Sequence, residues 1–281
     1  MDNGGTAPKL LFDSHAHLDH ENYSDKERGD IMDRVEKSPV AYVVDVGFDL
    51  KSSRQAIKDA AERPWCFAAV GVHPHDTEAF TDEDLSELHE LTGAPGVVAL
   101  GEIGLDFYRD YSPRDKQREA YKKQLALALD LGLPIIIHDR ESAGETIEIL
   151  KSEGAFSAER KAAFPKNPET GNPDARVLLH CFSGSAEQAA MYIGLGCTIS
   201  VAGPVTYKNN KKTTRVAAEI PLAHLLIETD APYLTPEPLR GQRNEPAYVE
   251  YVALKVAELR GITYEEVAAA TLANAKRFFG I

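Results

Sequence analysis

The feature that most constrains the fold of this chain is a regular alternation of short apolar runs with longer segments of helical periodicity. Eight runs rich in aliphatic and β-branched residues each end in polar, glycine or proline residues. Short buried strands separated by helices favour a parallel sheet, and eight such units in 281 residues predict a closed (β/α)₈ TIM barrel. An open doubly wound sheet is the alternative, but no GxGxxG motif follows the first run. The predicted strands span residues 10–17, 42–48, 67–74, 97–104, 134–140, 177–184, 197–203 and 225–232.

The segments between these strands carry helix signals. Residues 114–132 have apolar positions at helical spacing, and residues 185–196 open on a serine suited to an N-cap. The stretch 244–279 fits two C-terminal helices that cover the barrel. One connection, 141–176, is unusually long, and its proline-, glycine- and asparagine-rich part predicts a surface loop or insertion at about 153–174.

The composition is that of one globular domain spanning residues 1–281, with 43% apolar and 27% charged residues. No apolar run approaches the roughly 20 residues of a membrane helix, and the N-terminus lacks a basic region followed by an apolar stretch. Three widely spaced cysteines favour reduced thiols, so we expect a cytoplasmic protein without membrane association. A net charge of −13 disfavours broad electrostatic binding to a polyanion.

Histidines and carboxylates gather at the C-terminal ends of the predicted strands, where (β/α)₈ enzymes build their active sites. His15 and His17 are two residues apart, so in a strand both side chains leave the same face. A single buried polar group can be satisfied by one hydrogen bond, but six at one end of a packed barrel need a common partner. The six candidate metal ligands are His15, His17, Glu102, His138, His180 and Asp230.

Divalent metal ions fit this set of donors. Imidazole and carboxylate suit zinc, manganese, iron or nickel, whereas magnesium tolerates the set less well. Six ligands are too many for one open catalytic ion, but they suit two ions that share Glu102 as a bridging carboxylate. Two divalent ions held by two carboxylates leave a positive mouth, so even an acidic protein can bind a phosphodiester there.

Six motifs then support a family resemblance that runs from about residue 10 to the C-terminus: FDSHAHLD, GEIGLDFYR, PIIIHDR, LLHCFSG, LIETDAPYL and RNEPAYV. In this order they resemble the TatD family of metal-dependent deoxyribonucleases, part of the amidohydrolase superfamily. The resemblance implies a two-metal barrel (Zn, Mn or Mg) that hydrolyses DNA, with 3′-to-5′ exonuclease activity on single strands and a role in DNA repair. It implies that His15, His17 and Asp230 hold one metal, that His138 and His180 hold the other, and that Glu102 bridges them.

Further roles follow for residues near these ligands. Asp230 is the expected general base, and the resemblance makes His73 a contact for substrate phosphate, with a turn histidine as the alternative. Arg140 shares a strand face with the ligand two positions before it, and its guanidinium suits a phosphate. His75 is expected to cap a turn, and Cys181 to point into the helix layer.

Weaker candidates lie on the loops. Tyr108, Tyr207 and Tyr233 follow strand ends and can stack on bases, although loop tyrosines commonly just pack. Arg243 is a candidate either for substrate or for a loop contact with a carboxylate. The insertion departs from the family pattern, and its basic residues are candidates for extending the strand-binding track: Arg160, Lys161 and Lys166.

Two other functions compete with the nuclease. A small-molecule hydrolase of the same superfamily, acting on a lactone or cyclic amide, would commonly bridge its metals with a carboxylated lysine. The fourth strand, VVALGEIGLD, contains no lysine and offers Glu102 instead. A non-enzymatic binding protein would have no reason to keep every ligand, since function resides in the site rather than in the fold.

Overall fold

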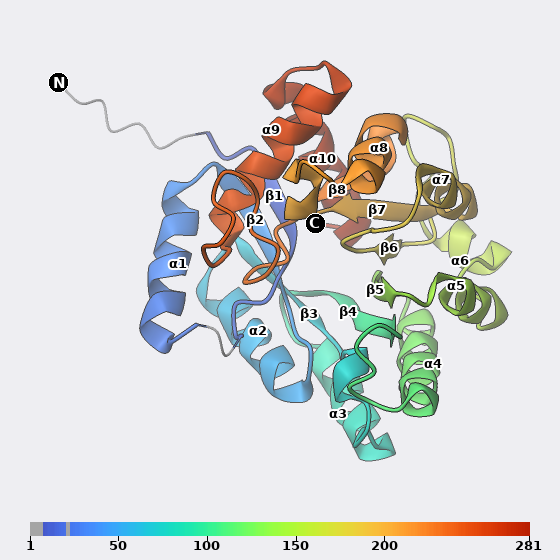
Figure 1. Ribbon diagram of the computed structural model, residues 1–281. Coiled ribbons are helices and arrows are strands. Elements are labelled where there is room, and N and C mark those ends of the chain that lie inside the picture. Colours follow the sequence, from blue (N-terminus) through green and yellow to red (C-terminus); the bar gives the residue numbers. More distant parts are fainter. Residues whose placement is uncertain (1–7, 21–22) are drawn as a thin grey trace.

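The structure is a computed structural model that describes residues 8–20 and 23–281. Eight parallel strands form one sheet in chain order, from β1 to β8 (Figure 1). They are β1 (Leu11–Ala16), β2 (Val40–Val46), β3 (Cys66–Val70), β4 (Val97–Asp106), β5 (Ile135–Arg140), β6 (Val177–Leu179), β7 (Cys197–Val201) and β8 (Leu225–Ile227).

The sheet closes between its first and last strands. Ala16 forms an isolated parallel bridge with Ala231, and the His17 N–H donates to the Ala231 carbonyl at 2.8 Å. The Asp230 N–H donates to the His15 carbonyl at 2.9 Å, so the chain after β8 is held directly against the end of β1. The (β/α)₈ barrel predicted from the alternation of elements is confirmed.

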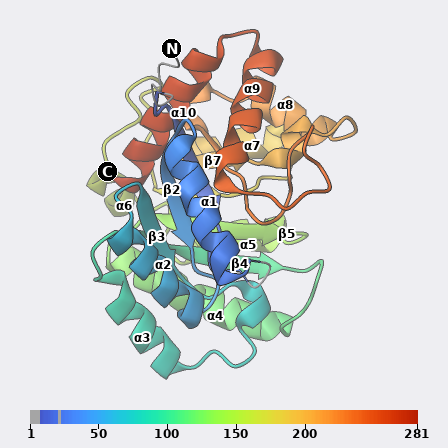
Figure 2. The same ribbon diagram turned by 90° about the vertical axis from the view of Figure 1, so that its left-hand side faces the viewer.

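Helices surround the sheet, as Figures 1 and 2 show. The predicted helix over 114–132 is α4, and the predicted serine cap begins α7, where Ser185 accepts from the Gln188 N–H. None of the helices in the described residues is long and apolar enough to cross a membrane. The helices are α1 (Asp25–Lys37), α2 (Leu50–Glu62), α3 (Asp82–Thr92), α4 (Arg114–Asp130), α5 (Ala143–Ser152), α6 (Ala158–Ala163), α7 (Ala186–Leu195), α8 (Lys211–Glu219), α9 (Val249–Arg260) and α10 (Tyr264–Phe279). Short 3₁₀ helices are η1 (Pro74–Asp76), η2 (Gly203–Thr206), η3 (Leu222–His224) and η4 (Pro246–Tyr248).

The barrel interior is filled by one face of the strands and sealed at the bottom by the end of α10. Phe12, Ile136 and Leu178 belong to a buried cluster that also contains Phe278 and Phe279. The rings of Phe12 and Phe279 stack at 5.7 Å between centroids. The N-terminal end of the barrel is therefore packed with aromatic side chains, and polar groups are left to gather at the C-terminal end.

The insertion at 153–174, which contains α6, lies at the N-terminal end of the barrel, on the same side as the C-terminus in Figure 2. Arg160 is buried and donates to backbone carbonyls directly before β5 and β6, at 2.8 Å each. The Asn167 side chain donates to the Ala223 carbonyl ahead of β8 at 2.9 Å. The suggestion that this insertion extends a strand-binding track at the barrel mouth is wrong, because strand starts and strand ends lie at opposite ends of the barrel.

Gly104 in β4 provides a test of how tightly the strands that carry the site are spaced. Its φ is +145°, and an added Cβ would overlap the carbonyl oxygen of His138 on β5. We expect Gly104→Ala to lower the free energy of unfolding by about 2 kcal/mol or more. Gly144→Ala is the control, since nothing lies within 4 Å of its added Cβ. Denaturant unfolding should separate the two variants, and equal stabilities would show that β4 tolerates a side chain at this position.

Candidate metal centre

Irregularities in strand pairing aim the first group of candidate ligands. The register of β1 against β2 shifts between Asp13 and Ala16, where the histidine pair begins. The register of β4 against β5 shifts between Leu100 and Ile103, on either side of Glu102. Such irregularities re-aim side chains next to functional sites. Here they bring groups from non-neighbouring strands to the same point at the barrel mouth.

The alternation of side chains along a strand explains the positions of the second group of candidate ligands, His138 and His180. His138 comes two residues after Ile136 in β5, and His180 comes two residues after Leu178, just beyond β6. Ile136 and Leu178 fill the barrel interior. Because alternate residues of a strand share a face, both histidines continue the inward-facing column at the upper end of the barrel.

The carboxylate of Glu102 lies at the centre of the site. Its Oε1 is 2.5 Å from His138 Nδ1 and 2.5 Å from His180 Nε2. Its Oε2 is 3.3 Å from His15 Nε2 and 3.6 Å from His17 Nε2. Each oxygen of one carboxylate therefore faces a different pair of imidazoles, as a bridging ligand requires.

Asp230 completes the set on the side of the first histidine pair. Its Oδ1 is 3.6 Å from His17 Nε2 and 3.9 Å from His15 Nε2. The residue follows β8 rather than lying within it, and its φ of 55° turns the side chain back to the mouth. All six residues singled out from the sequence as ligands thus come together.

The charges of the site depend on one another. Burial alone would raise the pKa of Glu102, but the imidazoles of His180, His73 and His138 outweigh it and hold that pKa well below its usual range. Burial alone would lower the pKa of His180, but the Glu102 carboxylate outweighs it and raises that pKa well above its usual range. The buried carboxylate thus requires positive charge at its two oxygens, which protons or metal ions can supply.

The histidines of the centre can offer nitrogen lone pairs to a metal ion when their other ring nitrogen carries the proton. His17 Nδ1 lies 2.7 Å from the Val46 carbonyl, which can only accept, so Nδ1 carries the proton and Nε2 offers a lone pair to the centre. His15 Nδ1 is buried and has no hydrogen-bond partner among the described residues. Donor groups lie within 4.8 Å of one another in three sets: His15–His17–Glu102, His73–Glu102–His138 and His15–His180–Glu228. The residues present therefore fit divalent metal ions.

Two carboxylates that were not among the residues expected from the sequence lie against these histidines. Asp106 is fully buried, and its Oδ2 lies 3.3 Å from His138 Nε2 and 2.8 Å from His75 Nε2. Glu228 Oε1 accepts from the Cys181 N–H at 2.6 Å and lies 3.5 Å from His180 Nδ1. Asp106 lies in the motif GEIGLDFYR, and Glu228 lies in the motif LIETDAPYL. Asp106 was overlooked because β4 runs two residues beyond its predicted end.

His73, and not His75, caps the turn after β3. His73 caps the turn at η1, where its Nδ1 accepts from the His75 N–H at 3.1 Å, so the expectation that His75 is the cap is wrong. A neutral His73 then carries its proton on Nε2, which points to the centre, 3.6 Å from Glu102 Oε1 and 3.3 Å from His138 Nδ1. Burial, with the neighbouring histidines, lowers the pKa of His73 well below its usual range.

The remaining candidates lie around this centre. Arg140 does not pair with the ligands; its guanidinium lies 4.1 Å from the Tyr108 ring centroid. Cys181 is half-buried, and burial with the nearby Asp230 and Glu228 carboxylates raises its pKa well above the usual range. It lies beside the centre, so its expected place in the helix layer is wrong. Arg243 pairs with Glu27 at 2.7 Å, the loop contact that was one of its alternatives.

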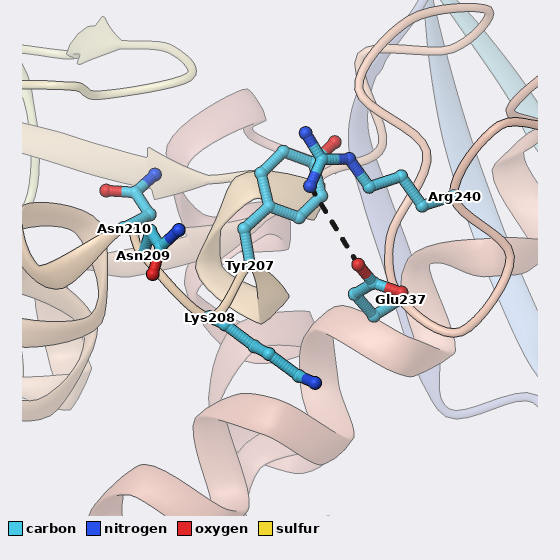
Figure 3. A pocket seen from close by; sticks show the side chains of 6 residues that line it. All are labelled: Tyr207, Lys208, Asn209, Asn210, Glu237 and Arg240. Carbon is cyan, nitrogen blue, oxygen red and sulfur yellow. Dashed lines mark ion pairs between the residues drawn. The ribbon is translucent and has the colours of Figure 1, made fainter.

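A separate hollow of about 450 Å³ opens between η2 and the loop after β8 (Figure 3). Arg240 lies over the ring of Tyr207 at 4.3 Å and is 3.9 Å from a Glu237 carboxylate oxygen. The hollow contains none of the six candidate ligands, so it is distinct from the metal centre. It is lined by Tyr207, Lys208, Asn209, Asn210, Glu237 and Arg240.

Comparison with known proteins gives the family of this chain. The family described as "TatD related DNase" matches residues 12–280. The uncharacterized metal-dependent hydrolase YabD of Bacillus subtilis is 44% identical over 97% of this chain and 100% of its own length. The 3′-5′ ssDNA/RNA exonuclease TatD of Erwinia tasmaniensis is 33% identical over 96% of this chain and 100% of its own length. The crystal structure of YJJV, a TatD homologue from Escherichia coli K12, has a TM-score of 0.84 and 30% identity over 97% of this chain and 99% of that one.

The barrel with histidines and carboxylates at its mouth defines a metal-dependent hydrolase that acts on ester bonds. Within that class, the chain belongs to the TatD family.

The newly found Asp106 offers a test of how the site is held. We expect Asp106→Asn to weaken metal binding by about 10- to 100-fold, because the carboxylate that orients His138 and His75 loses its charge. Asp110→Asn, on the loop that follows β4, is the matched control, since among the described residues that carboxylate pairs with Arg114 alone, on the surface. Competition with a chromogenic chelator measures both affinities. Similar values for the two variants would remove the orienting role of Asp106.

Proposed function

We propose that this protein hydrolyses phosphodiester bonds of single-stranded DNA from the 3′ end, using two divalent metal ions. The observation that carries the proposal is the placement of Glu102, whose two oxygens face two separate pairs of imidazoles. Relatives named 3′-5′ ssDNA/RNA exonuclease support the substrate class. A role in DNA repair and a cytoplasmic location belong to the same proposal. The first rests on the family alone, and the second rests on the three widely spaced cysteines.

The ligands divide into two groups around that carboxylate. His15, His17 and Asp230 would hold one ion, His138 and His180 would hold the other, and Glu102 would contribute to both. When bound, such ions polarise the phosphodiester and lower the pKa of water to about neutral. Zinc and manganese suit this set best, and magnesium remains a candidate.

Asp230 is the proposed general base. Its side chain is 14% exposed, against 0% for His15 and 3% for Glu102, so water can reach its free oxygen. Burial alone would raise its pKa, but the neighbouring imidazoles of His17, His180 and His15 together outweigh it and keep the pKa below the usual range. The carboxylate is therefore ionised at neutral pH and can accept a proton from attacking water.

Two further residues would bind the phosphate. The Nε2–H of His73 points into the centre and can donate to a phosphoryl oxygen as negative charge develops there. Arg140 leaves β5 on the same face as His138 and keeps its charge unpaired by any acidic residue in the described part of the chain. Its planar guanidinium suits two phosphate oxygens.

The experiment that tests the proposal is digestion of a single strand labelled at either end, with zinc, manganese or magnesium added. Stepwise shortening from the 3′ end is the expected result. A lactonase from Listeria monocytogenes shares the fold at a TM-score of 0.61 and 14% identity, a likeness that extends to the fold alone. Turnover of lactones with no cleavage of DNA would favour the small-molecule hydrolase instead.

The number of metal ions tests the bridging role of Glu102. We expect about two divalent ions per chain after the protein is reloaded with metal, because the six donors form two groups around one carboxylate. Elemental analysis measures this number. A value near one would remove the bridging role, and a value near zero would contradict the metal centre.

Asp230→Asn tests the general base. The amide keeps the size of the side chain but cannot accept the proton, so we expect kcat to fall by about 10² or more while DNA binding is largely kept. The control is Asp130→Asn, at the exposed far end of α4. Steady-state kinetics at saturating metal compares the two, and near-normal turnover by Asp230→Asn would exclude it as the base.

A further inference from the structure

Two tyrosines on the connection after β4 expose most of their surface. Tyr108 is 59% exposed and Tyr111 is 63% exposed, the highest values among the large hydrophobic side chains of the described residues. Arg140 lies 4.1 Å from the ring centroid of Tyr108, and Arg109 lies 5.7 Å and 5.9 Å from the centroids of Tyr108 and Tyr111. These four residues are called the Tyr–Arg platform below.

The platform borders the metal centre. The ring of Tyr111 lies 4.8 Å from that of His75, and His75 shares the Asp106 carboxylate with His138. Arg140 is two residues beyond His138 in β5. A strand with a phosphate at the metal centre would therefore place a neighbouring nucleotide against these rings.

The loop that carries the platform is held in place before any ligand binds. Asp106 Oδ1 accepts from the backbone N–H groups of Tyr108 and Arg109 at 2.9 Å each. Arg114 donates to the Phe107 carbonyl at 3.1 Å. The same carboxylate group thus fixes both a histidine of the centre and the backbone below the exposed rings, which lowers the entropic cost of binding.

We propose that the Tyr–Arg platform is a subsite for the unpaired bases and flanking phosphates of a nucleic-acid strand, placed beside the bond to be cut. This inference rests on the proposed function and adds the residues that would select single strands. Exposed aromatic rings stack on any base whose face is free, whereas bases in a duplex are already stacked on one another. The guanidinium groups add a cation–π contribution and attract phosphate.

The charge pattern favours this assignment. The chain carries a net charge of −13, yet neither Arg109 nor Arg140 pairs with an acidic side chain among the described residues. The pair of Arg240 and Tyr207 differs, because Arg240 has Glu237 beside it and covers the half-buried ring of Tyr207. Unneutralised positive charge over exposed rings is what a single strand, and not an apolar protein surface, would complement.

Binding without cleavage tests the platform directly. Fluorescence anisotropy is measured with the metal-loaded protein and labelled oligothymidylate whose phosphodiester linkages are replaced by hydrolysis-resistant phosphorothioates. An abasic strand of equal length with the same backbone is measured beside it. We expect Tyr108→Leu to weaken oligothymidylate binding by about fivefold or more, the lower limit for one stacked base, and to leave abasic binding unchanged. Tyr108→Phe should bind within about twofold of the wild type, since the ring remains. Leu131→Ala, 41% exposed at the other end of α4, is the control and should match the wild type.

Several results would overturn the platform. These are undetectable binding of oligothymidylate, equal affinity of the wild type for both strands, or equal affinity of the wild type and Tyr108→Leu for oligothymidylate. A loss confined to Tyr207→Leu would assign stacking to the hollow of Figure 3 instead. Base-dependent binding that needs Tyr108, without hydrolysis under any added metal, would support the platform and contradict the nuclease function.

Discussion

A carboxylate buried among imidazoles is the interaction on which the rest of this structure depends. Glu102 is 2% exposed and stays ionised because positive charge is available at both of its oxygens. An isolated buried charge is costly, so every element around it must hold its partners in place. The shifted registers of β1 and β4, the close approach of β4 to β5 at Gly104, and the carboxylates of Asp106 and Glu228 all serve that requirement.

The barrel and the six inner donors could be predicted from the sequence because each depends on a local pattern. Strand alternation places His138 and His180, and the parallel sheet brings strand ends together whatever the loops do. The ends of the strands were predicted less well than their positions. β6 and β8 have three residues each, whereas eight residues were predicted for each. Two and three residues beyond these strand ends, Cys181 and Asp230 take positive φ, a backbone conformation that the apolar pattern of the strands does not indicate.

What the sequence could not predict depends on pairing between distant residues. Asp106 and Glu228 were visible as acidic residues, but nothing local indicates which histidine each would orient. The position of the insertion at 153–174 also depends on contacts with residues distant in the sequence. Its basic residues suggested contact with DNA, yet Arg160 is buried against carbonyls ahead of β5 and β6. A connection that follows the end of a strand can run to the opposite end of the barrel. The end at which its side chains lie is known only from the folded structure.

The aromatic side chains at the N-terminal end close the barrel there, so the metal centre can be reached only from the C-terminal end. Phe12 and Phe279 stack across the floor, and the Asn167 side chain of the insertion donates to the Ala223 carbonyl ahead of β8 at the same end of the barrel. A linear polymer that reaches the metal centre therefore has no exit opposite its entrance and cannot be drawn through the protein as through a ring. For the exonuclease proposed above, the new end would have to back out, or shift sideways along the rim, before the next bond reached the centre. Topological confinement would not keep that substrate attached between successive cleavages, so its retention would depend on contacts at the rim alone.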